Sequence, residues 1–381
     1  MIGGLHRQLR QAYARAGMLY ELHLDLLYQC DLDCEHCYLD DKSRRILTTA
    51  FWTDVIDQAA ALQVASVLIS GGEIFLRKDL LDIVAHARSH GLFVNLKSHG
   101  GAIDEAIARR LYDLGVSTVW LSYYASDPAI HDAITRRPGS HARTRAAIER
   151  LARAGIVTVA SIAVMQRNRA QWREAVDEVR ALGALASVDG QLRAAHSGDP
   201  FPKALRAQLD DLVGLEAFHA DHEHEACDPE APAARPAWED QKECAAGHLA
   251  LYVGPEGELT PCVAWPMPLG NLARGDRLAD LWRASPALQR IQAYRKVDRV
   301  LCASCPVRED CDFCMGQAWV ETGDPRAAIT NLCWTTRAKT LARAAARGLP
   351  EPPMPAGLVD GAPAAPARRF PIRVVAPDPR P

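Results

Sequence analysis

The amino-acid sequence predicts an α/β fold with a parallel sheet, followed by a smaller cysteine-rich domain. Short apolar runs alternate with longer amphipathic segments between residues 20 and 193. Strands that alternate with helices in this way form parallel sheets with right-handed crossovers. Three cysteines follow the first apolar run, and seven more lie between residues 244 and 333. The chain has 381 residues, 48% of them hydrophobic, which is enough for two domains.

The elements of the first domain follow from this alternation. Residues 1–19 are polar with a helical tendency and form a lead-in, and a first strand is expected over 20–30. The helix near residue 47 has threonine at its N-cap position, a residue that favours helix starts. The later strands are expected at 65–70, 92–97, 116–122, 157–165 and 186–193, and the helices at 47–62, 78–90, 104–114, 140–154 and 169–183.

The regions outside the two domains differ from them in composition. Residues 219–240 hold His219, His222 and His224 among acidic residues, then turn rich in proline and alanine. We interpret this stretch as a linker or mobile loop, although clustered histidines can also bind zinc. It separates a first domain at 20–218 from a second at 241–340, and residues 341–381, rich in alanine, proline and arginine, form a tail.

Composition excludes several classes of protein. The formal net charge is −3, so there is no basic footprint for nucleic acid. No run of eighteen apolar residues predicts a membrane span, and the N-terminus lacks the apolar core of a signal peptide. The 11 cysteines therefore indicate metal binding in a reducing, cytoplasmic compartment. A secreted disulfide protein is the alternative, and the odd cysteine count argues against it.

The most informative segment is Cys30-Asp-Leu-Asp-Cys34-Glu-His36-Cys37. Three close cysteines after a strand can bring three sulfurs to one site, and thiolates are the ligands that iron–sulfur clusters and zinc prefer. Three ligands leave one position of a four-ligand site open, as in a catalytic zinc site or a cluster with one free iron. The alternative is three structural cysteines.

A second motif, Gly71-Gly72-Glu73, ends the expected strand at 65–70. Glycine lets the backbone approach a ligand closely, and Glu73 places a carboxylate at the carboxyl end of the strand. An ordinary tight turn would explain the same residues.

Together these motifs resemble the radical S-adenosylmethionine (SAM) superfamily, whose signature is C-x3-C-x2-C with an aromatic residue or histidine, here His36, before the last cysteine. The resemblance implies a [4Fe–4S] cluster on Cys30, Cys34 and Cys37, with SAM on the fourth iron. Reduction of SAM then yields a 5′-deoxyadenosyl radical that abstracts a substrate hydrogen. The resemblance also implies an open (β/α)6 barrel, with a Gly-Gly-Glu motif that binds the SAM amino group.

The resemblance extends to the later strand ends. Ser98-His99-Gly100 stands where relatives often carry Thr-Asn-Gly, and Ser122 stands in a Ser-x-Asp-Gly position. The following His131–Gly139 stretch is similar to the family's HDxIRG, but the family arginine falls on Thr135, so Arg136 or Arg137 would replace it. Ser98, Ser122 and Arg136 are thus expected SAM contacts, Tyr123 and Tyr124 are candidates to line the cavity, and Asn168 is taken as a loop residue.

The second cysteine array begins beside a hairpin signal, Gly-Pro-Glu-Gly at 254–257. Two zinc ribbons would explain these thiols, but the array resembles the SPASM extension of many radical SAM enzymes. That resemblance implies two auxiliary [4Fe–4S] clusters, and the last gap of the quartet is x2 here where the family has x3. One cluster would use Cys302, Cys305, Cys311 and Cys333, and the other Cys244, Cys262 and Cys314, with its fourth position open or filled by Cys227 or a carboxylate.

SPASM enzymes commonly modify ribosomally made peptides, so the predicted function is oxidative crosslinking of a precursor peptide. The alternatives are oxidation of a small molecule or protein side chain, peptide epimerisation, and an iron–sulfur or zinc binding protein without chemistry. The residues before the first strand are too few for a leader-binding domain, so a separate protein could supply one. An electron donor such as flavodoxin or ferredoxin is also expected, and no catalytic base is identified.

Overall fold

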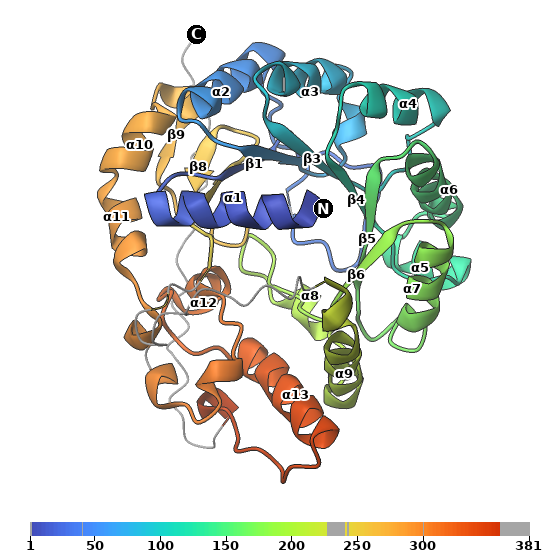
Figure 1. Cartoon of the computed structure of the whole chain (residues 1–381), viewed down its shortest axis with the longest axis vertical. Helices are drawn as coiled ribbons and strands as arrows, with labels where there is room; N and C mark the ends of the chain where they lie inside the picture. The colour runs from blue at the N-terminus through green and yellow to red at the C-terminus, as the bar shows by residue number, and fades with distance from the viewer. Residues whose placement is uncertain (1, 40, 227–240, 242–243, 300, 359–381) are drawn as a thin grey trace.

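Strands from most of the length of the chain form one nine-stranded sheet (Figure 1). The structure, a computed structural model, describes residues 2–39, 41–226, 241, 244–299 and 301–358. The strand order is β6-β5-β4-β3-β2-β1-β7-β8-β9, so β6 and β9 form the two edges and the barrel is open. The strands are β1 (Glu21–Asp25), β2 (Ser66–Ser70), β3 (Phe93–Ser98), β4 (Thr118–Ser122), β5 (Val157–Ala163), β6 (Leu185–Asp189), β7 (Ala250–Val253), β8 (Glu258–Thr260) and β9 (Gly270–Asn271).

The first six strands are parallel neighbours joined by helices, which confirms the predicted partial barrel. Helix α2 illustrates why the segments fold as they do. Thr48 caps it by accepting the Phe51 N–H at 3.3 Å, and Trp52 and Ile56 are fully buried one helical turn apart. The connecting helices are α2 (Thr49–Ala61), α3 (Leu80–Ser89), α4 (Glu105–Asp113), α5 (Pro128–Thr135), α6 (Ser140–Arg153) and α7 (Trp172–Ala181).

Strand β1 shows how the sheet positions a site. Leu22 and Leu24 are fully buried, whereas His23, between them, lines a cavity on the opposite face. Side chains of a strand alternate between faces, so one face builds the core and the other is available for chemistry.

The cysteine-rich domain continues the same sheet. Strand β7 pairs in parallel with β1, with Leu22 opposite Leu251, and the predicted hairpin of β7 and β8 is present. The remaining helices include a lead-in helix, α1 (Ile2–Ala16), as expected. The others are α8 (Phe201–Ala204), α9 (Leu209–Ala226), α10 (Leu278–Ala284), α11 (Pro286–Ala293), α12 (Met315–Thr322) and α13 (Thr330–Ala346).

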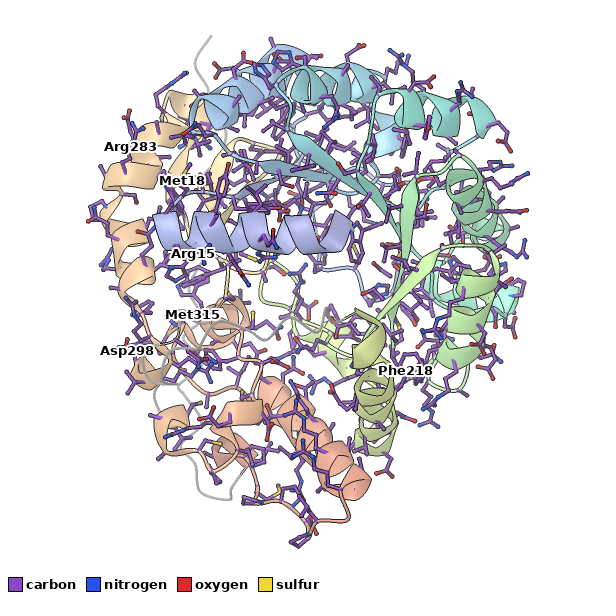
Figure 2. All side chains as sticks on the ribbon, viewed as in Figure 1. Arg15, Met18, Phe218, Arg283, Asp298 and Met315 are labelled. Atoms are coloured by element: carbon purple, nitrogen blue, oxygen red, sulfur yellow. The ribbon has the colours of Figure 1, made fainter. Side chains whose placement is uncertain are left out.

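The expected loop at 219–240 is wrong for its first residues, because helix α9 continues to Ala226. Phe218, labelled in Figure 2, packs edge-on against Trp172, with ring centroids 5.0 Å apart. His219 Nε2 donates to the Val188 carbonyl oxygen at 3.1 Å. Helices α9 and α13 lie side by side. Tertiary packing thus holds a helix where composition alone indicates a loop; residues 227–240, with Cys227, lie outside the described residues.

Helix α13 likewise runs six residues into the expected tail, to Ala346, and residues 359–381 lie outside the described residues. None of the described helices is both long and apolar enough to cross a membrane.

Candidate active site

A cavity of about 290 Å³ opens at the carboxyl ends of the parallel strands. Sites of parallel α/β folds lie at this end, and the cysteine loop that follows β1 forms one wall. The cavity holds nine of the predicted site residues. These are Cys30, Cys34, His36, Cys37, Gly71, Gly72, Ser98, Ser122 and Tyr124; the others in the wall include His23, Tyr38, Lys42, Ser70, Lys97, His99, Trp120, Ser161, Arg193 and Val263.

The cysteine loop is docked on the end of helix α5. The N–H of Asp33 donates to the Thr135 carbonyl at 3.1 Å, and the N–H of Glu35 donates to the Ile134 carbonyl at 2.9 Å. The loop has little regular structure of its own, so these contacts help to set the direction in which its thiols point. Thr135, which replaces the family arginine, therefore supports the loop through its backbone.

The three thiols interact through their charges. Burial, together with the charges of Cys37 and Cys30, raises the pKa of Cys34 to about 12. Burial also raises the pKa of the Cys37 thiol. All three cysteines line the same cavity, and thiolates gathered there would repel one another unless a cation lay among them. The donor set therefore fits a metal centre, which deprotonates its thiol ligands.

His36 lies in the same wall, with its ring edge-on to Tyr124 at a centroid distance of 4.9 Å. Burial lowers its pKa to about 4, so the ring is neutral at pH 7. Its Nδ1 atom is buried without a hydrogen-bond partner among the described residues. A polar atom left in this state at the cavity wall fits contact with a bound cofactor.

Gly71 and Gly72 bring the turn after β2 against the segment that leads into the cysteine loop. The N–H of Gly72 donates to the Leu27 carbonyl at 2.8 Å. A Cβ atom on Gly72 would lie 2.3 Å from the Gln29 carbonyl oxygen, and one on Gly71 would lie 2.2 Å from that of Leu27. These glycines therefore permit the close approach of the protein's own backbone rather than that of a ligand.

The carboxylate of Glu73 lies behind the cavity wall, with 1% of the residue exposed. It accepts hydrogen bonds from Ser98 Oγ at 2.8 and 2.9 Å and from the His99 N–H at 2.9 Å. The N–H of Phe75 donates to it as well, at 3.0 Å. Ser98 and His99, rather than Glu73, therefore present this network to the cavity.

Arg136 lies outside the cavity wall. Its backbone has a φ of 52°, at the end of helix α5, and its guanidinium contacts Asp33 Oδ2 at 3.1 Å. Its neighbour Asp132 accepts from the N–H of Gly139 and His141 at 2.5 and 2.8 Å, and so caps helix α6. Asn168 also has a structural role: it bonds the Tyr124 carbonyl and the Met165 N–H, at 2.7 Å each.

Sequence reasoning missed two cations in the cavity wall, Lys97 and Arg193. The ammonium of Lys97 lies 6.0 Å from the Trp120 ring centroid, and the guanidinium of Arg193 lies 3.9 Å from that of Tyr38. Within the described part of the chain, neither has a carboxylate within ion-pair distance, so this wall is positive and suits an anionic group. The sequence could have indicated Lys97 through its place on the face of β3 that lines the cavity. No motif marks Arg193.

The second array brings its cysteines into two groups. In the first, burial and the charges of Cys311, Cys333 and Cys305 raise the pKa of Cys302 to about 12. In the second, Cys314 lies close enough to Cys262 to raise its pKa, in addition to burial. The assignment of these cysteines to two clusters stays a prediction, and Cys244 is the exposed member of its predicted set. Val263, next to Cys262, lines the active-site cavity, so the second group adjoins it.

Comparisons with known proteins agree with this geometry. The profile of the "Radical SAM superfamily" matches residues 26–179, and SPASM, an "Iron-sulfur cluster-binding domain", matches residues 244–306. The chain is 31% identical over 373 residues to the PqqA peptide cyclase of Streptomyces rochei, covering 90% of this chain and 96% of the relative. The chain belongs to the radical SAM superfamily and carries a SPASM domain.

Other relatives give the same picture. The PqqA peptide cyclase of Methylocella silvestris is 31% identical over 330 residues, which cover 80% of this chain and 84% of the relative. The crystal structure of Streptococcus suis SuiB bound to the precursor peptide SuiA aligns with a TM-score of 0.66 at 18% identity. That alignment covers 85% of this chain and 79% of SuiB and shows a shared fold. The predicted radical SAM and SPASM family and fold class are confirmed.

Proposed function

We propose that this radical SAM enzyme oxidatively crosslinks a ribosomally made precursor peptide. The observation that carries the proposal is the convergence of Cys30, Cys34 and Cys37 at the mouth of a cavity that also adjoins Cys262. Such a cavity lets one substrate lie near both iron–sulfur sites. The PqqA peptide cyclases, whose names identify a peptide substrate, support the choice of a peptide.

In this proposal Cys30, Cys34 and Cys37 hold a [4Fe–4S] cluster, and SAM lies in the adjoining cavity. When bound, the two supply a 5′-deoxyadenosyl radical that abstracts a hydrogen atom from the substrate. Gly71 and Gly72 hold the turn against the cysteine loop, His36 and Ser122 line the cofactor pocket, and Glu73 acts through Ser98 and His99. Arg136 acts by fixing Asp33.

The SPASM cysteines hold two auxiliary [4Fe–4S] clusters, and a new bond requires an electron acceptor. Forming a crosslink after hydrogen abstraction releases one further electron and a proton, and Cys262 and Cys314, which lie beside the cavity, would hold a cluster able to accept that electron. The fourth ligand of that cluster is Cys227, a carboxylate or an open position. The other cluster uses Cys302, Cys305, Cys311 and Cys333.

We further propose a cytoplasmic location, where flavodoxin or ferredoxin supplies electrons and a separate protein binds the leader segment of the peptide. Two other reactions share the same first step: dehydrogenation of a small molecule or protein side chain, and peptide epimerisation. Epimerisation leaves the substrate mass unchanged, whereas crosslinking removes two hydrogens. The mass of the product therefore separates crosslinking from epimerisation, whereas dehydrogenation, which also removes two hydrogens, is separated by the identity of its substrate.

The first experiment is anaerobic reconstitution with iron and sulfide, followed by an assay of 5′-deoxyadenosine. The wild type is expected to hold about twelve irons, four for each cluster, and the Cys30, Cys34, Cys37→Ala variant about eight. Undiminished 5′-deoxyadenosine from the variant would contradict the cluster assignment, and four irons with stoichiometric zinc would make the SPASM array a zinc fold.

The second experiment is co-expression with short reading frames that neighbour the gene, and mass spectrometry of the peptides in deuterated water. A peptide two hydrogens lighter supports crosslinking. A peptide that gains one solvent deuterium and is otherwise unchanged in mass would establish epimerisation instead.

A further inference from the structure

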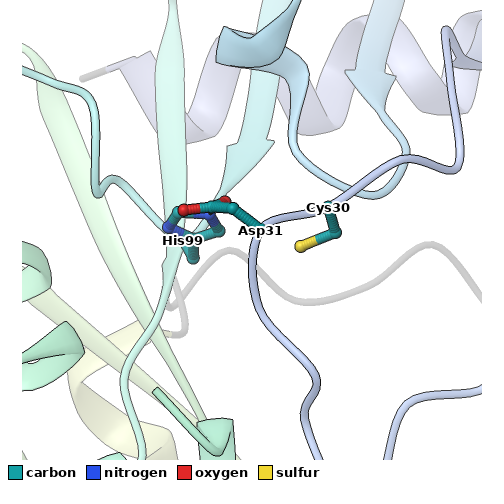
Figure 3. Close-up of side chains that lie close together, drawn as sticks. All are labelled: Cys30, Asp31 and His99. Atoms are coloured by element: carbon teal, nitrogen blue, oxygen red, sulfur yellow. The ribbon is translucent and has the colours of Figure 1, made fainter. Parts of the chain in front are cut away.

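The side chain of His99 lies close to Asp31 and Cys30 of the cysteine loop (Figure 3). Its Nε2 atom lies 2.8 Å from Asp31 Oδ1 and 3.0 Å from Glu73 Oε2. A ring nitrogen of His99, the Sγ of Cys30 and a carboxylate oxygen of Asp31 all lie within 4.8 Å of one another. One ring therefore contacts two segments that are distant in sequence, next to a proposed cluster ligand.

The proton of this ring can be placed from its neighbours. The N–H of Gly101 donates to His99 Nδ1 at 3.0 Å, which leaves Nε2 as the protonated nitrogen of the neutral ring. With Nδ1 accepting from Gly101, the ring carries its proton on Nε2 and donates it toward the two carboxylates and the thiol.

We infer that His99 is a positioning residue that fixes Asp31 against Glu73 and thereby raises the reduction potential of the cluster on Cys30, Cys34 and Cys37. The inference rests on the proposed cluster at that site. His99 is only 8% exposed, so its dipole acts in a region of low dielectric, where such interactions are strong. Hydrogen-bond donors near cluster sulfurs and a lower local negative charge both favour the reduced cluster.

Loss of the donor has a definite sign. Without the Nε2 proton, the carboxylates of Asp31 and Glu73 face each other, and the Cys30 thiolate loses a nearby donor. Both changes increase the negative charge felt by the cluster and disfavour the uptake of an electron. An asparagine side chain at this position is too short to span from β3 to Asp31 as histidine does.

The test is an anaerobic redox titration of the reconstituted full-length enzyme, followed by electron paramagnetic resonance. The signal of this cluster is identified by its change when SAM is added. His99→Asn is expected to retain the wild-type iron content while the equilibrium constant for reduction falls about tenfold, which is about 59 mV for one electron. His99→Gln, whose longer amide can donate to Asp31, should recover most of that loss.

His86→Gln is the matched control, because His86 also contacts an aspartate, Asp57, but on the surface of α3. It should leave the potential unchanged. An unchanged potential in His99→Asn would overturn the inference. Loss of iron from both His99 variants would also overturn it, because His99 would then be needed to build the loop. If the wild type shows no SAM-dependent signal, the proposed function fails instead.

Discussion

At the scale of single residues, the Gly-Gly-Glu motif led to the correct family, but the roles expected for its residues were incomplete. Sequence reasoning assigned the glycines to close approach by a ligand, and Glu73 to the SAM amino group. In the structure the glycines accommodate the backbone of residues 27–29, and the Glu73 carboxylate is filled by donors of its own chain. These partners lie far away in sequence, so only the folded chain identifies them.

Gly72→Ala is expected to displace the cysteine loop. The added Cβ atom would meet the carbonyl oxygens of Gln29 and Tyr28 at 2.3 and 2.5 Å, and such overpacking costs about 2–3 kcal/mol. Urea unfolding and iron analysis should show lower stability and loss of about four irons. Gly91→Ala is the control: Gly91 has a φ of 76° but open space around it, so it should lose about 1 kcal/mol and no iron. Equal effects would refute the displacement.

Glu73→Gln tests the hydrogen-bond network of Glu73 by removing its negative charge. The glutamine amide would place a donor group against Ser98 Oγ or the His99 N–H, where Glu73 accepts from both. Charge-assisted bonds are worth about 1.5–3 kcal/mol, so SAM affinity should fall about ten- to a hundredfold while the iron content stays constant. Equilibrium binding of SAM provides the measurement, with the exposed Glu105→Gln as control. Unchanged affinity would exclude a role for Glu73 in SAM binding.

His131 predicts a pH dependence of stability. The residue is 1% exposed, and burial lowers its pKa from 6.5 to about 4, aided by the nearby His141. Between these two pKa values His131 is protonated in the unfolded chain but neutral in the folded chain. The free energy of unfolding therefore falls as the pH falls from about 6.5 to 4. His131→Gln removes this contribution, which is about 2 kcal/mol between pH 7 and pH 5. Equal pH dependence in both proteins, by urea unfolding, would contradict it.

At the scale of elements, local signals predicted the six β-α units because each depends on neighbouring residues. The Thr48 cap and the buried stripe of α2 are examples. Helix α9 was missed where its side chains are polar, because packing against α13 and Trp172 stabilises it. Lys97 and Arg193 were missed because a cavity wall is assembled from several elements, and no local spacing encodes it.

Asp132→Ala should weaken helix α6 and the docking of the cysteine loop together. Asp132 accepts from the N–H of His141 at 2.8 Å, and loss of a cap costs about 1 kcal/mol. It also ties α5 to α6, and α5 offers the Ile134 and Thr135 carbonyls to the loop. Asp104→Ala removes a comparable cap from α4, so both variants should lose similar stability by urea unfolding. Only Asp132→Ala should release iron faster to a chelator. Equal release rates in the two variants would show that the Asp132 cap does not support the docking of the cysteine loop.

At the scale of the molecule, the sequence predicts two domains, whereas the strands form one sheet. Strand β7 of the cysteine-rich domain pairs with β1 along four residues, and Asn331 of α13 donates to the Leu192 carbonyl of the first domain at 2.9 Å. The proposed grouping of the cysteines follows from motif spacing, because the spacing reflects local loops. The pairing of β1 with β7 joins residues more than two hundred positions apart, so the local hydrophobic periodicity of the sequence cannot predict it.

This continuity predicts that the two parts unfold as one unit. Val253 on β7 is fully buried, and Val253→Asp would place an unpaired charge there, at a cost of about 3–5 kcal/mol. Because β7 covers the edge of β1, hydrogen exchange should then accelerate across β1 to β4 as well as in the hairpin. Leu185→Asp is the control, since Leu185 lies on the edge strand β6 and is 60% exposed. Faster exchange confined to residues 244–358 would show that the domains are independent, despite their shared sheet.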